Sequence, residues 1–162
     1  MEIEALANVP LFAALDPRER QTLASVLVAH KFDPGQIVFN QGDKGFSCFV
    51  ILAGKVDVEG AASQGRRTLA TLDAGAMFGE VALLDHGRRS ATCVAGPHGC
   101  VLAELRSSEF DMIFNAGNGF AYKLLDMIAV QVVRNLRSAS TQLRNLASED
   151  AMREALAQRD DS

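Results

Sequence analysis

The middle of the chain is a series of short β-prone runs, and this feature constrains the fold most. Between Phe32 and Leu105 the runs are separated by Gly, Asp and Pro; they read QIVF, CFVILAG, KVDVEG, RTLATL, AMFG, ATCVA and CVLAEL. Runs of this kind, bounded by turn residues, are typical of β-strands. Many short strands in succession predict a sandwich or a barrel. We therefore expect a mainly β core over residues 32–106.

A small helical segment is expected before this core, over about residues 1–31. Residues 8–15 suggest helical turns. Asp16-Pro17 then predicts the start of a helix, because aspartate caps a helix and proline fits its first position. The expected order at the N-terminus is therefore helices followed by strands.

Helices are also expected after the core, over residues 107–160. A glycine-bearing break at 117–119 interrupts them, and from Phe120 nothing breaks helical periodicity until about Gln158. Two apolar rows with heptad spacing share one face of this long helix. The rows are Leu125, Val132, Ala139 and Leu146, and Ala129, Leu136 and Leu143. Such a face packs either on its own domain or on a second copy, and we favour a homodimer through residues 125–146.

Composition excludes several classes of protein. The 162 residues fit a single domain, and an apolar share of 48% is enough to bury a core, which excludes disordered and fibrous chains. The net charge of −4 provides no field that would draw the chain onto nucleic acid. The acidic start MEIEALANVP is unlike a signal peptide, and no apolar stretch approaches about 18 residues. We expect a cytoplasmic protein with neither nucleic acid nor membrane as a partner.

The cysteines and histidines give no support to disulfide or metal chemistry. The three cysteines, Cys48, Cys93 and Cys100, are an odd number without a C-x-x-C pair, and they lie within apolar runs. They are expected to be buried free thiols. The three histidines, His30, His86 and His98, are scattered, whereas a metal site needs clustered ligands.

Residues 78–92 carry the most informative pattern, FGEVALLDHGRRSAT. Gly79 permits a close backbone approach, and the residues after it can form a short helix whose free N–H groups suit an anion. Arg89 supplies a bidentate fork, with the Ser90 hydroxyl beside it. A carboxylate at Glu80 would repel this anion unless it accepted a hydrogen bond, for example from a neighbouring sugar hydroxyl. The combination indicates a phosphorylated ribose.

Each of these residues also has a plainer interpretation. Glu80 and Arg89 could pair on a surface loop, Gly79 could be a turn glycine, and Arg88-Arg89 could be solvated charge. Only the combination of the residues favours a binding site.

Together the residues resemble the phosphate-binding cassette of the cyclic nucleotide-binding domain family, whose pattern is an apolar residue, G-E, a short apolar turn and R-[ST]-A. The resemblance covers about residues 5–150 and extends upstream to Gly42-Asp43-Lys44-Gly45, Gly54 and Gly75. It implies a double-sheet β-roll of jelly-roll topology, with N-terminal helices and a long C-terminal helix.

The resemblance also implies roles for the matching residues. Glu80 would bind the ribose 2′-hydroxyl, Arg89 the cyclic phosphate, and neighbouring backbone and hydroxyl groups would complete the site. The implied set is Gly79, Glu80, Val81, Ala82, Arg89, Ser90 and Ala91. The sequence departs from the family at Arg88, where proline is common, and at Cys48 and Cys93, where aliphatic residues are usual. None of these departures removes a ligand contact.

The last helix is similar to the dimerisation helix of the bacterial catabolite activators, in which polar side chains reach the purine. Ser140 is the matching candidate, with Ser138 and Thr141 as further candidates, and it favours cAMP over cGMP as the ligand. We expect a sensor, and not an enzyme, that passes occupancy through this helix to an unknown downstream partner. We expect no DNA-reading helix-turn-helix element within these 162 residues.

Two other functions remain open at this point. The chain could be a ligand-free roll that acts as a dimerising interaction domain, although the presence of Glu80 and Arg89 argues against this. It could also be a metal-dependent enzyme on a small β-roll, although the histidine spacing argues against the usual version. Whether it is complete or the regulatory fragment of a larger protein is not decided by the sequence.

Overall fold

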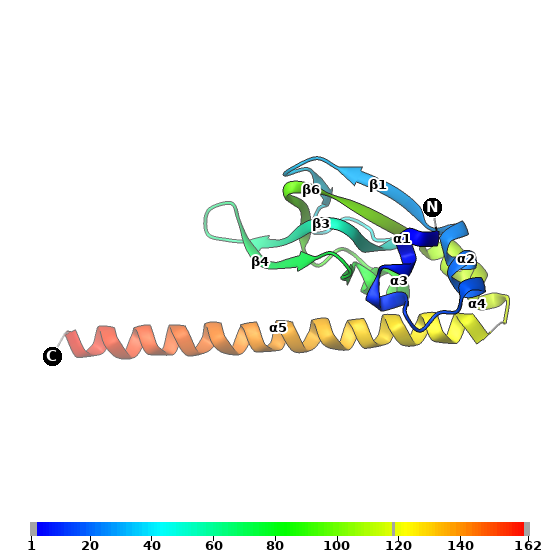
Figure 1. Ribbon diagram of the computed structural model, residues 1–162. Helices are drawn as coiled ribbons and strands as arrows, with labels where there is room; N and C mark the ends of the chain where they lie inside the picture. The colour runs from blue at the N-terminus through cyan, green and yellow to red at the C-terminus, as the bar shows by residue number, and fades with distance from the viewer. Residues whose placement is uncertain (1–2, 118, 161–162) are drawn as a thin grey trace. The chain divides into compact units, whose positions relative to one another are not determined.

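The computed structural model describes residues 3–117 and 119–160 (Figure 1). The N-terminal helices are α1 (Ile3–Ala7), the 3-10 helix η1 (Pro10–Phe12) and α2 (Pro17–Val26). The strands are β1 (Val28–Phe32), β2 (Ile37–Phe39), β3 (Ser47–Ala61), β4 (Arg66–Asp73), β5 (Met77–Phe78) and β6 (Thr92–Arg106). The remaining helices are α3 (Glu80–Asp85), α4 (Ser107–Asn115) and α5 (Gly119–Asp160).

The helix predicted after Asp16 is confirmed as α2. The Asp16 side chain accepts a hydrogen bond from the Glu19 backbone N–H at 2.9 Å, and the Glu19 carboxylate accepts one from the Asp16 N–H at 2.8 Å. These two bonds form a capping box, with Pro17 at the first helical position. The helical segment ends at Val26, earlier than the expected boundary at residue 31. The helices end earlier because β1 begins at Val28.

Strand β1 is formed by long-range pairing that the local sequence does not reveal. Val28–Phe32 pairs antiparallel with β6, from Val28 opposite Glu104 to Phe32 opposite Cys100. Helix α1 lies within the helical segment expected over residues 1–31, and η1 lies within the turns expected at residues 8–15.

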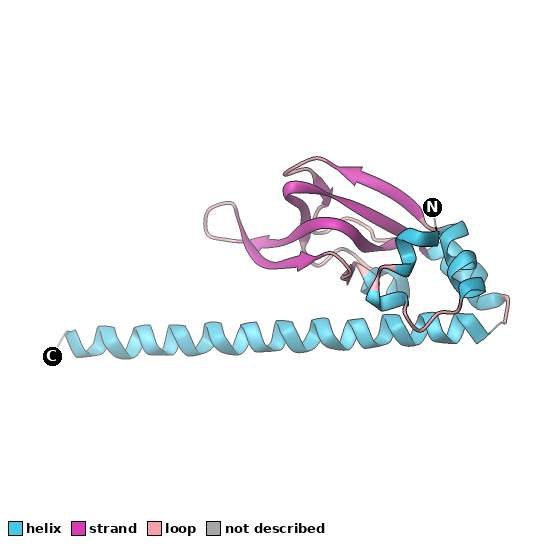
Figure 2. Cartoon of the chain, in the orientation of Figure 1, coloured by secondary structure: helices cyan, strands magenta, loops and turns pink. Residues whose placement is uncertain are grey.

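The expected β-roll is confirmed (strands in magenta in Figure 2), and its six strands form one hydrogen-bonded sheet with β3 and β6 at its centre. The first half of β3 pairs with the second half of β6, flanked by β1 and β5. The second half of β3 pairs with the first half of β6, flanked by β2 and β4. Two runs that the sequence shows separately, 48–54 and 55–60, are therefore one strand of 15 residues. All the pairings between these strands are antiparallel.

Glycines occupy the place where β3 passes from one half of the roll to the other. The pairing register of β3 with β6 shifts between Ile51 and Ala53 and again after Gly54. Gly54 has a φ of +80°, and a Cβ there would collide with the carbonyl oxygen of Gly99. Only glycine combines this backbone conformation with such a close approach.

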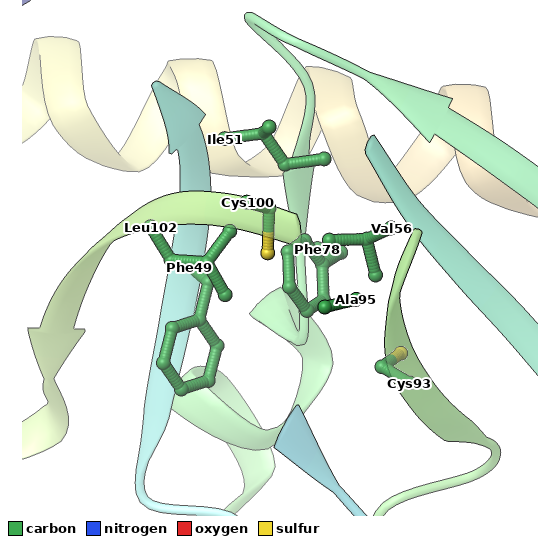
Figure 3. Packing of buried hydrophobic residues seen from close by; sticks show 8 residues of the cluster. All are labelled: Phe49, Ile51, Val56, Phe78, Cys93, Ala95, Cys100 and Leu102. Atoms are coloured by element: carbon green, nitrogen blue, oxygen red, sulfur yellow. The ribbon is translucent and has the colours of Figure 1, made fainter. Parts of the chain in front are cut away.

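The core of the roll is made of inward-facing residues from both halves (Figure 3). Its buried members are Phe49, Ile51, Val56, Phe78, Cys93, Ala95, Cys100 and Leu102. The rings of Phe49 and Phe78 stack with centroids 5.4 Å apart. Cys48, Cys93 and Cys100 are buried free thiols, as expected from the sequence. Since Phe78 ends β5, this packing anchors the strand that leads into α3.

Contacts divide the chain into two units, one ending at Met127 and one beginning at Ile128. The first contains the roll and helices α1 to α4, and the second contains most of α5. The long helix predicted from Phe120 is confirmed, because α5 runs without interruption over 42 residues. The expected glycine break lies between α4 and α5, and Asn118 within it is outside the described residues. Across residues 3–117 and 119–160, no helix is both long and apolar enough to cross a membrane.

Candidate ligand-binding site

The candidate site begins at Gly79, between β5 and α3. Gly79 adopts a left-handed conformation with a φ of +74° and turns the chain directly into α3. A Cβ at this position would lie 2.7 Å from Nη1 of Arg89. The close approach expected at Gly79 is therefore present, and the group that approaches is the Arg89 side chain.

Helix α3 separates its first residues into inward and outward positions. Glu80 is buried, with 3% of its surface exposed, and Ala82 is buried beside it. Val81 faces solvent with 52% exposed. A carboxylate is rarely buried to this degree without a functional or paired role. The helix thus holds the Glu80 carboxylate inside the protein and not on a surface loop.

Arg89 is also buried, with 7% of its surface exposed. Its Nη1 donates a hydrogen bond to the Gly79 carbonyl oxygen at 3.1 Å, and its Nη2 donates to the Ser47 hydroxyl at 3.4 Å. The centre of the guanidinium lies 4.2 Å from the centroid of the Phe39 ring, which is a cation–π contact. Burial lowers the pKa of the Arg89 guanidinium, but arginine remains charged at neutral pH. The site therefore contains a fixed positive charge.

The neighbouring Arg88 has different surroundings. It is exposed, and its Nη1 donates a hydrogen bond to the Gly42 carbonyl oxygen at 2.7 Å. Of the two adjacent arginines, Arg88 therefore contacts a loop at the surface, whereas Arg89 is buried. Arg89 is not part of a solvated basic patch.

The upstream glycine motif lies against the cassette. The Gly42 N–H donates to the Arg89 carbonyl oxygen at 2.8 Å, and the Arg89 N–H donates to the Asp43 carbonyl oxygen at 2.7 Å. The Gly45 N–H donates to the Gly87 carbonyl oxygen at 2.9 Å. Two motifs separated by more than thirty positions in the sequence are thus joined by backbone hydrogen bonds.

The predicted site residues are divided between the two units. Gly79, Glu80, Ala82 and Arg89 lie at one place in the first unit, and the Ser90 side chain next to them is exposed. Ser140 belongs to the second unit, on an exposed stretch of α5. Ser138 and Thr141 are exposed on the same stretch, and the Thr141 hydroxyl donates to the Arg137 carbonyl oxygen at 3.0 Å.

Two residues at the site were missed from the sequence. Ser47 accepts a hydrogen bond from Arg89, and Phe39 packs on its guanidinium. In the sequence Phe39 is only one residue of a β-prone run, QIVF. The sequence contains one indication of Ser47, which is a polar residue directly before the apolar run CFVILAG. Its orientation toward Arg89 depends on the register of the β3–β6 pairing, which the sequence does not show.

The two cysteines that depart from the family pattern behave as apolar side chains. Burial raises the pKa of the Cys48 thiol and of the Cys93 thiol to about 12. Both thiols are therefore neutral at physiological pH and chemically unreactive. Within the described part of the chain, no group of three or more His, Cys, Asp or Glu side chains could hold a metal ion.

The arrangement is suited to binding a molecule with two different polar groups. A buried carboxylate accepts hydrogen bonds from hydroxyl groups, and a buried guanidinium donates to an anion. The surroundings exclude water from both groups, which strengthens each contact.

Comparisons with known proteins agree with this geometry. The sequence profile of the cyclic nucleotide-binding domain matches residues 29–116. A cyclic AMP receptor protein from Thermus thermophilus is 35% identical over 143 residues, which are 88% of this chain and 64% of that protein. A cAMP-dependent protein kinase regulatory subunit from Hypocrea atroviridis is 34% identical over 90 residues, covering 56% of this chain and 19% of that protein.

A similar fold is found in a solved structure of a cyclic nucleotide-binding domain from Methylobacillus flagellatus. The two structures superpose with a TM-score of 0.76 at 25% identity, over 88% of this chain and 81% of that one. The chain spans less than two thirds of the length of both curated relatives.

Proposed function

Because the chain belongs to the cyclic nucleotide-binding domain family, we propose that Glu80 and Arg89 hold a cyclic nucleotide and that the chain acts as its sensor. The observation that carries the proposal is the burial of both charged side chains around Gly79, within the first unit. Burying a carboxylate and a guanidinium costs free energy, so their presence is best explained by a ligand that uses both.

Each charged group matches one part of the ligand. The Glu80 carboxylate accepts a hydrogen bond from the ribose 2′-hydroxyl, and the Arg89 guanidinium binds the cyclic phosphate. Backbone and hydroxyl groups of the cassette complete the contacts; they come from Gly79, Val81, Ala82, Ser90 and Ala91. The role is binding, with no bond made or broken.

The preferred ligand is cAMP over cGMP. Two relatives with 34% and 35% identity are named for cyclic AMP. Ser140 of α5 is the residue proposed to offer a hydroxyl to the adenine. Competition between cAMP and cGMP in a binding titration measures this preference, and a cGMP preference above about tenfold would reverse the assignment.

Signalling is proposed to pass through α5 to a downstream protein. The apolar rows at 125–146 are largely uncovered, with Leu136 61% exposed and Leu143 68% exposed. A second copy would bury this face, so we infer a homodimer. A hinge at 117–119 would let ligand binding shift the helix, since Gly117 has a φ of +66°.

A thermal shift experiment tests the binding proposal. A ligand at about a hundred times its Kd adds ~2.7 kcal/mol to the free energy of unfolding, which raises the melting temperature of a chain this size by about 5 to 10 °C. Millimolar cAMP should produce this shift in the wild type and a much smaller one in the variant Arg89→Ala. If neither cAMP nor cGMP moves the transition of the wild type, the sensor proposal fails.

A further inference from the structure

The loop between α3 and Arg89 has an unusual backbone conformation. Helix α3 ends at Asp85, and the next residue, His86, has a φ of +52°. In the part of the chain that the structure describes, His86 is the only residue other than glycine with a positive φ. Its N–H donates to the Ala82 carbonyl oxygen at 3.0 Å. A residue with a side chain adopts this conformation at a cost in free energy, so neighbouring contacts must hold the loop.

Asp85 supplies one of these contacts. Its Oδ1 accepts a hydrogen bond from the Gly87 N–H at 2.7 Å, which closes a turn around His86. The carboxylate lies directly against Gly87, since a Cβ at that residue would be 2.9 Å from Oδ1 and 3.0 Å from Oδ2 of Asp85. The contact between Asp85 and Gly87 therefore fixes the direction in which the chain leaves α3.

Gly87 connects this turn to the upstream glycine motif. Its carbonyl oxygen accepts a hydrogen bond from the Gly45 N–H at 2.9 Å. Two residues later, the Arg89 N–H donates to the Asp43 carbonyl oxygen at 2.7 Å. The loop after α3 is thus held along the segment 42–45 by backbone hydrogen bonds.

Gly45 in turn lies against the Arg89 side chain. A Cβ at Gly45 would be 3.0 Å from Nε of Arg89 and 3.1 Å from the central carbon of its guanidinium. The same Cβ would collide with the Cβ of Ala82. The Gly45 backbone therefore forms one wall of the space that contains the guanidinium, and the hydrogen bond to Gly87 keeps this wall in place.

We propose that Asp85 is a positioning residue of the ligand site: acting through Gly87 and Gly45, its carboxylate keeps the Arg89 guanidinium in the orientation that binds the phosphate. The inference rests on the proposed function, since the ligand is taken to be a cyclic nucleotide. Asp85 is not among the residues that the cassette pattern specifies. An ordered guanidinium binds an anion more tightly, because less side-chain freedom is lost on binding.

Charge alone predicts a different result. Asp85 is an anion on the same short helix as Glu80, so its removal would strengthen the binding of an anionic ligand if it acted only by repulsion. If Asp85 positions Gly87, the hydrogen-bond acceptor matters and the charge does not. Asparagine keeps a side-chain acceptor without the charge, whereas alanine removes both. The variants Asp85→Asn and Asp85→Ala therefore separate the two explanations.

The test is titration calorimetry of the full chain with cAMP and with cGMP. Asp85→Ala should weaken binding about fivefold, the size of one hydrogen bond, and Asp85→Asn should bind within about twofold of the wild type. Asp57→Ala is the matched control. Asp57 Oδ1 also accepts one hydrogen bond at 2.7 Å, from Thr71 Oγ1 in the β3–β4 ladder, and the affinity of this variant should be unchanged.

A measurement without ligand keeps this inference separate from the proposed function. Amide hydrogen exchange, followed by NMR, should accelerate at Gly87 and Gly45 in Asp85→Ala, but not in Asp85→Asn or Asp57→Ala. Unchanged or tighter binding by Asp85→Ala, an equal loss in Asp85→Asn, or unchanged exchange at Gly45 would each overturn the positioning role. If the wild type bound neither nucleotide, the proposed function would fail, and the exchange at Gly45 would still decide whether Asp85 holds this wall in place.

Discussion

Replacing Arg89 by alanine should weaken cyclic nucleotide binding by at least about a hundredfold. The guanidinium uses one N–H on the Gly79 carbonyl oxygen and one on the Ser47 hydroxyl, and the others can donate to a phosphate. A bidentate contact consists of two charge-assisted hydrogen bonds of about 1.5 kcal/mol or more each. Loss of both therefore costs ~3 kcal/mol, which corresponds to a factor of more than a hundred in Kd.

Arg88→Ala is the matched control for this change. It removes the same charge one residue away, but Arg88 is exposed and bonded to Gly42, so its contribution should not exceed ~1 kcal/mol, or about fivefold. Titration calorimetry at fixed ionic strength gives both values, and circular dichroism melting verifies that both variants are folded. Equal losses at the two positions would mean that a general basic patch holds the phosphate, and the argument from the buried geometry would be wrong.

The remaining predictions concern the sugar contact and the long helix. Glu80→Ala should weaken cAMP binding by ~2 kcal/mol, about thirtyfold, yet bind 2′-deoxy-cAMP as well as the wild type does, because the deoxy ligand has no hydroxyl for Glu80 to accept from. A full Glu80 effect on the deoxy ligand in the same titration would contradict the assigned contact. Leu136→Glu should give monomers in analytical ultracentrifugation at micromolar concentration, because two like charges would meet where the apolar rows of two copies pair. Dimers in that experiment would mean that the apolar rows of residues 125–146 do not form the contact between two copies.

The fold was predictable from the sequence to the extent that local patterns determine it. The Asp16 cap, the succession of β-prone runs and the unbroken periodicity of the last helix each correspond to an element of the structure. The sequence does not predict strand β1, because its five residues carry no marked pattern and become a strand only by pairing with the distant strand β6. The merging of separate runs into β3 likewise depends on pairing across the corner at Gly54.

The site was predictable where a contiguous motif encodes it. Gly79, Glu80 and Arg89 lie close together in the sequence, and their combination predicts one site. Ser47 and Phe39 come from two different strands, and their contacts with Arg89 depend on how β3 and β2 pair with β6. A shift of either strand's register by one residue would turn its side chain to the opposite face of the sheet. No local pattern fixes such a register.

The burial of Arg89 helps to explain why the protein contains buried charges at Glu80 and Arg89. In the free protein the guanidinium is already removed from water and is held by Gly79, Ser47 and Phe39. The cost of desolvating it is thus part of the free energy of folding, and replacing buried charges by apolar groups often leaves a fold equally stable or more stable. The same burial increases the affinity for a phosphate, because the guanidinium is already dehydrated and its rotamer is already fixed before the ligand binds. A roll that served only as a dimerising scaffold would bear the folding cost without that gain, so the buried pair of Glu80 and Arg89 favours a ligand-binding role over a purely structural one.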